Sequence, residues 1–145
     1  MNLYYLFRIL HLVSMAAWLG AAMWVASDLK RTLNLGAPHT SVVAARVVPA
    51  LKLDVWAGVA TIVTGVVLAG LAHSHRIGIA VGFPLALVLF ILVMTVVLPA
   101  GKRAAAAAEA GQLDEARRLT KSVAAFSGVG HLLWLAALVA MALPY

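Results

Sequence analysis

The chain has 145 residues, of which 64% are hydrophobic and only 11% charged, whereas an ordinary soluble domain is about half apolar and about a quarter charged. This composition argues against a water-soluble monomer, and the length leaves no room for enzymes built on large barrels or Rossmann sheets. Because the chain has no cysteine, disulfide scaffolds, thiolate metal sites and iron–sulfur clusters are excluded, and any metal must be held by His, Met, Asp or Glu.

Four apolar segments follow one another along the chain, at residues 4–27, 55–72, 77–99 and 122–143. Each is long enough to cross a bilayer core, which takes about 20 helical residues. The first segment carries Trp18 and Trp24 where a signal peptide would carry small residues, so we expect it to stay in the mature protein. The pattern predicts an all-α fold, with four antiparallel transmembrane helices forming one bundle over residues 1–145.

Basic residues are distributed unevenly between the connections. The inner loops 28–54 and 100–121 hold nine of the eleven Lys and Arg residues, and the other two are Arg8 and Arg76. Since cytoplasmic loops are enriched in Lys and Arg, this asymmetry places both loops in the cytoplasm and both termini outside a bacterial-type inner membrane. The net charge of +6 is thereby explained without a nucleic-acid partner, and the predicted partner is the lipid bilayer.

The connections themselves show three patterns. The stretch 41–53 is amphipathic and predicts a short helix on the inner membrane surface, with a break at Pro49 before Asp54 opens the second span. The third span should continue as a polar helix beyond Pro99 and end near Gly111. The stretch 73–76 is short enough for a tight turn only.

Small residues on the second span (Gly58, Thr61 and Gly65) favour close helix packing.

Two histidines lie inside the predicted spans, where an ionisable side chain is costly and indicates function by default. Neutral imidazole is also the commonest metal ligand. At helical spacing, one face of the first span carries Arg8, His11, Met15 and Trp18. One face of the fourth span carries Ser127, His131, Trp134 and Leu138. Polar and aromatic residues therefore follow the same faces as the two histidines.

Three interpretations fit these faces. In the first, haem b lies between the helices with His11, His131 or both on iron, Trp18 and Trp134 packing on the macrocycle, and Arg8 or Arg76 near the propionates. In the second, His11 and Met15 belong to a copper path, with His73 and His75 as an outer capture site and Met23 or Met94 further along. In the third, the histidines only donate hydrogen bonds between helices, as in an accessory membrane subunit without a cofactor.

Depth separates the two histidines along the membrane normal. At about 1.5 Å per residue, His11 lies about 6 Å outward from the middle of its span and His131 about 3 Å inward. Two histidines that bind the same iron must lie at similar depth in the membrane. The offset therefore disfavours a single haem site held by both His11 and His131. Two separate sites, or His11 with another axial ligand such as Met15 of a neighbouring protomer in a homo-oligomer, remain as alternatives.

The stretch 6–33 resembles the first span of small four-helix membrane proteins grouped with the CopD-like copper-resistance proteins and the HemJ-type protoporphyrinogen oxidases. Their hallmark is a histidine followed seven residues later by tryptophan and then by a glycine, which His11, Trp18 and Gly20 match. The resemblance implies haem b binding through His11 and, in the HemJ-type branch, oxidation of protoporphyrinogen. The lysine expected near the start of the third span is missing, because that region reads Arg76-Ile77-Gly78-Ile79.

These observations predict a membrane protein that binds haem b and acts in electron transfer or porphyrin redox chemistry, with a quinone or a porphyrin as candidate partner. The alternative is copper transport or resistance, and the second alternative is a structural accessory subunit.

Overall fold

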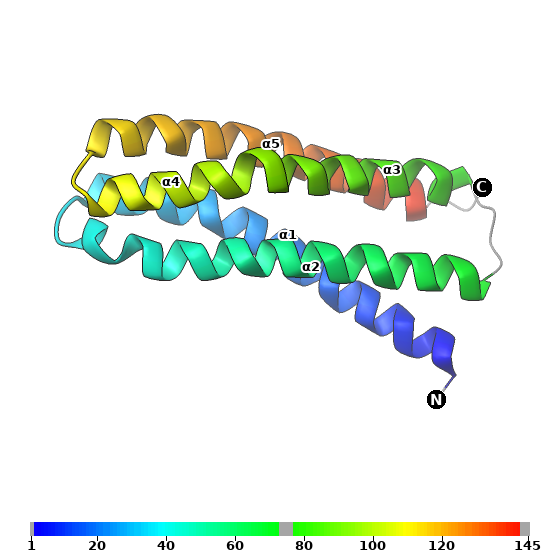
Figure 1. Ribbon diagram of the computed structural model, residues 1–145. Helices are drawn as coiled ribbons and strands as arrows, with labels where there is room; N and C mark the ends of the chain where they lie inside the picture. The colour runs from blue at the N-terminus through cyan, green and yellow to red at the C-terminus, as the bar shows by residue number, and fades with distance from the viewer. Residues whose placement is uncertain (1, 73–76, 143–145) are drawn as a thin grey trace.

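The computed structural model describes residues 2–72 and 77–142. Its elements, in chain order, are α1 (Leu3–Leu35), the 3₁₀ turn η1 (His39–Val42), α2 (Val43–Ala72), α3 (Ile77–Leu92), the π-helical turn η2 (Val93–Val97), α4 (Leu98–Glu109) and α5 (Leu113–Ala142). Because α3, η2 and α4 join into one rod, the described residues form four long antiparallel rods (Figure 1). Each rod is long and apolar enough to cross a membrane, and the predicted all-α four-helix bundle is confirmed.

Two ends of the bundle are distinguished below. The loop end holds the connections after α1 and after α4, and the terminal end holds the start of α1 and the end of α5 (Figure 1). At the loop end, α1 stops before Gly36 (φ +68°), and α4 stops before Gly111 (φ +73°). Glycine adopts these left-handed conformations without a steric penalty. The predicted helical extension beyond Pro99 and its end near Gly111 are therefore confirmed, whereas the predicted turn at 73–76 lies outside the described residues.

The first connection differs from the prediction of a surface helix broken at Pro49. Instead, α2 runs without interruption from Val43 to Ala72 with Pro49 inside it. Its apolar face does not lie on a membrane surface, because Val43, Val47 and Leu51 are fully buried in the bundle core. Most of the predicted inner loop is thus helix, and the real connection between α1 and α2 is the short segment around η1.

The core is densest at the loop end, where α4 packs against α1, α2 and α5. The alanine run 104–108 supplies most of the α4 contribution, and Ala104 and Ala105 have no exposed surface. Gly101 brings α4 close to α2, since a Cβ atom there would lie 2.9 Å from Leu51 Cδ1. Small side chains on α4 therefore set the close spacing of the rods at this end.

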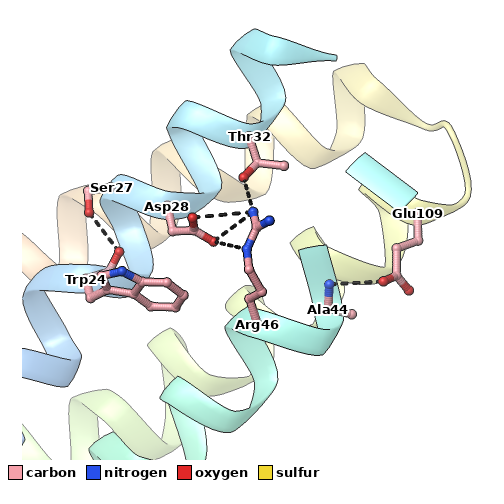
Figure 2. Close-up of polar contacts among 7 residues, drawn as sticks. All are labelled: Trp24, Ser27, Asp28, Thr32, Ala44, Arg46 and Glu109. Atoms are coloured by element: carbon pink, nitrogen blue, oxygen red, sulfur yellow. Dashed lines mark hydrogen bonds and ion pairs between the residues drawn. The ribbon is translucent and has the colours of Figure 1, made fainter. Parts of the chain in front are cut away.

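Polar side chains tie the same end together (Figure 2). Arg46 on α2 donates to both carboxylate oxygens of Asp28 on α1, with Nη2–Oδ2 at 3.3 Å, and donates to Thr32 Oγ1 at 2.6 Å. Glu109 at the end of α4 accepts a hydrogen bond from the backbone N–H of Ala44 at 3.0 Å. That N–H belongs to the first turn of α2, where it has no partner within the helix.

The helices separate into two pairs toward the terminal end. Gly78 and Gly82 let α3 lie directly against α5, since a Cβ atom at Gly78 would collide with the Ala140 carbonyl. The N-terminal half of α1, blue in Figure 1, instead crosses α2 obliquely and leads away from α3 and α5. The bundle is therefore tightly packed at the loop end and divided at the terminal end.

The packing of α4 predicts a position-specific effect of side-chain size. Ala105→Leu should destabilise the bundle by about 1–3 kcal/mol, because the added carbon atoms have no space in the core. Ala106→Leu is the matched control, since Ala106 is exposed on the same helix. The measurement is unfolding by sodium dodecyl sulfate in mixed micelles, followed by circular dichroism. Equal midpoints for the two variants would contradict the described packing.

Candidate functional site

A large cavity of about 770 Å³ lies between the two helix pairs. Its volume is within the range of about 300–1,000 Å³ that is typical of small-molecule and cofactor sites. Residues of α1, α2, α3 and α5 line it, and they are predominantly apolar or aromatic. Its lining residues belong to the half of the bundle that holds the start of α1 and the end of α5. In this half, α1 diverges from α3 and α5 (Figure 1).

His11 lines this cavity from α1, and hydrogen bonds to α2 hold its ring. His11 Nδ1 lies 3.0 Å from the Thr61 carbonyl oxygen and 3.0 Å from Thr64 Oγ1. The carbonyl oxygen can only accept, and the Thr64 hydroxyl donates to a backbone carbonyl, that of Ala60 at 2.6 Å or of Thr61 at 3.1 Å. Nδ1 must therefore carry the proton and share it between two acceptors. Nε2 then holds the lone pair and is the nitrogen that remains for a ligand.

Glycines on α2 make room for the side chains of α1. A Cβ atom at Gly65 would lie 3.1 Å from His11 Cε1, and one at Gly58 would lie 3.1 Å from Trp18 Cε2. Both distances are shorter than ordinary van der Waals contacts. The predicted small-residue face of the second span thus serves helix packing and also seats the two ring systems.

Most of the other residues on the two predicted helix faces also line the large cavity. Arg8, Met15 and Trp18 line the large cavity from α1, and Trp134 and Leu138 line it from α5. Tyr4, one turn before Arg8, also lines it and was not singled out from the sequence. The predicted propionate partner Arg76 lies outside the described residues.

His131 faces a different space from His11. It lines a small cavity of about 20 Å³ on the loop-end side of the large one, together with Ser127 and Asp54. Trp18, Leu89 and Trp134 line both cavities and therefore lie between them. This placement agrees with the offset in depth that the sequence predicts for the two histidines.

Asp54 is the polar residue that the sequence interpretation missed. It was expected to open the second span at the membrane surface, but it lies well inside α2 and is only 1% exposed. The residue spacing could have shown that Asp54 faces the other helices. Asp54, Gly58, Thr61 and Gly65 follow one another at intervals of four, three and four residues. These intervals place Asp54 on the same helix face as the predicted packing residues.

The residues of the predicted copper path are not gathered in one place. Met15 shares the large cavity with His11, whereas Met23 and Met94 are 58% and 41% exposed on the outside of the bundle. His73 and His75 lie outside the described residues. Within residues 2–72 and 77–142, three or more His, Asp or Glu side chains nowhere come together as a metal site.

Comparison with protein families, with curated proteins and with solved structures gives no match to this chain. The residues and their geometry are therefore the basis for assigning a role to the large cavity.

The hydrogen bonds of His11 predict its tautomer. In ¹⁵N NMR spectra of histidine-labelled protein in lipid, the His11 signal should show a protonated Nδ1 and an unprotonated Nε2 at neutral pH. A His11→Gln variant identifies the signal, and His39→Gln serves as the control because His39 is exposed at the loop end. A His11 signal with the proton on Nε2 would contradict the described hydrogen bonds.

Proposed function

We propose that this protein binds haem b in the large cavity, with His11 as an axial ligand of the iron through Nε2, and that it acts in membrane electron transfer or porphyrin redox chemistry. The observation that carries the proposal is the fixed orientation of His11, whose Nδ1–H bonds to α2 leave the Nε2 lone pair for a metal. Metal-ligating histidines in proteins almost always donate their other N–H to such a partner.

The lining of the large cavity fits a flat, mostly apolar cofactor with acidic groups at one edge. Trp18 and Trp134 supply aromatic surface, Met15 a thioether, and Arg8 with Tyr4 supplies polar groups toward the terminal end. Arg8 would pair with carboxylates there. When bound, haem b supplies one-electron redox chemistry, whereas the protein supplies the ligand, the apolar surroundings and the charge at Arg8.

The resemblance of the first span to the CopD-like and HemJ-type proteins supports the same assignment. His11 and Trp18, two of the three residues that carry the resemblance, both line the large cavity. We further propose that the loop end is cytoplasmic in a bacterial-type inner membrane, because the basic residues of the two inner loops gather there. The large cavity would then open in the outer half of the membrane, within reach of a quinone or a porphyrin.

The optical spectrum of the purified protein tests the proposal directly. Protein expressed with haem supply should show a Soret band that sharpens on reduction, and His11→Ala should abolish it. His39→Ala should retain the band, because His39 lies far from the cavity in the fold, and His131→Ala should retain it as well, because His131 lines the other cavity. A colourless protein with one copper ion per chain would overturn the haem proposal in favour of copper transport. A colourless, metal-free protein would favour an accessory subunit.

A second prediction concerns the support of the His11 ring. Thr64→Val removes one acceptor of the Nδ1–H and should weaken haem binding by about 10-fold, since loss of such partners typically costs about 10–100-fold in metal affinity. Thr95→Val is the matched control, because the Thr95 hydroxyl also donates to its own helix, at the Ile91 carbonyl, but is exposed. Haem titration followed by absorbance measures both affinities. An equal affinity in the two variants would contradict the role of Thr64.

A further inference from the structure

A second polar site lies inside the bundle, in the small cavity on the loop-end side of Trp18. Two of its polar atoms, Asp54 Oδ1 and His131 Nε2, are buried without a hydrogen-bond partner. Leaving one such buried atom unpaired costs about 1–3 kcal/mol. Two unpaired atoms that line the same cavity therefore indicate that a small ligand completes their hydrogen bonding.

We propose that Asp54 and His131 form a proton-binding site bridged by one water molecule, through which a proton passes from one side chain to the other. The cavity volume of about 20 Å³ accommodates about one water molecule. Such a water can accept a proton from the Asp54 carboxyl group while it passes one of its own to His131 Nε2. The O–H bond at Asp54 breaks, a new N–H bond forms at His131, and the water is regenerated.

The charges around Asp54 favour a proton as the ligand. A buried carboxylate must pair with a cation, coordinate a metal or become protonated. Among the residues that the structure describes, no Lys or Arg lines the cavity: α1 and the α3–η2 rod contribute only apolar and aromatic residues, and His131 is the other titratable group. The nearest basic residues in sequence on the same two helices, Lys52 and Lys121, are exposed.

A metal ion fits this site less well than a proton. Its polar lining consists of Asp54, Ser127 and His131, whereas Ca²⁺ takes six to eight oxygen ligands and Mg²⁺ a near-octahedral set. The rest of the lining is apolar or aromatic and supplies no further ligands. The donor set therefore matches a proton with a neutral bridging water better than a metal ion.

Two features connect the site with its surroundings. Trp18 lines both the small cavity and the large cavity, so a change in the position of its ring would affect both sites. In addition, Val93 and Val97 of the π-helical turn η2 line the small cavity. Short π-helical turns inside α-helices occur frequently at functional sites.

Infrared spectroscopy of the protein in lipid vesicles tests the proposal at a series of pH values. The wild type should show the C=O band of a neutral carboxylic acid at pH values where surface carboxylates are ionised, and the band should shift in D₂O. Carboxyl-¹³C-aspartate should move the band, which identifies an aspartic acid without any substitution. Asp54→Asn should remove it, and Asp114→Asn should retain it, because the Asp114 side chain is fully exposed.

His131→Gln tests the pairing itself. Glutamine cannot take the proton, so the pH midpoint at which the neutral carboxyl band of Asp54 disappears should change from that of the wild type. His39→Gln is the control and should leave the midpoint unchanged. Absence of the band in the wild type, its survival in Asp54→Asn, or an unchanged midpoint in His131→Gln would each overturn the proposal. The site needs no cofactor, so these results do not depend on whether the large cavity holds haem.

Discussion

Small side chains on α2 let α1 lie close enough for His11 to reach the α2 backbone, and the polar interior of the bundle depends on this contact. An imidazole N–H buried between helices needs a hydrogen-bond partner, and a neighbouring helix can supply it. Thr61 and Thr64 supply that partner, and Gly65 supplies the space for the ring. The orientation of His11 therefore follows from the pairing of α1 with α2.

The tightest packing and the large cavity are located at opposite ends of the bundle. At the loop end, alanines of α4 and the Arg46–Asp28 pair hold the rods together. Toward the terminal end the rods separate, and the space between them becomes the large cavity. The well-packed end thus acts as the support that keeps α1 and α5 at a fixed distance across the open end, which a preformed ligand site requires.

The sequence predicts the four helices because hydropathy and length are properties of each segment alone. It also predicts the face that carries His11, Met15 and Trp18, since helical spacing is a local property as well. The sequence pattern predicted the wrong start of the second helix, because Pro49 and Asp54 suggest a helix boundary in the sequence. In the structure α2 continues through both residues, and its neighbours here are buried against other helices. The division of the two histidines between separate cavities depends on which helices pair, and no single segment contains that information.

The π-helical turn η2 affects which side of the α3–η2–α4 rod carries its buried residues. Buried positions along it are mostly four residues apart, as at Gly78, Gly82 and Ala86 and again at Leu89, Val93, Val97 and Gly101. An ordinary α-helix has 3.6 residues per turn, so a row with steps of four would wind gradually around it. The wider turn takes up part of the surplus chain and helps to keep the buried positions on one side of the rod, which packs against α5 along its whole length and also against α2 at α4.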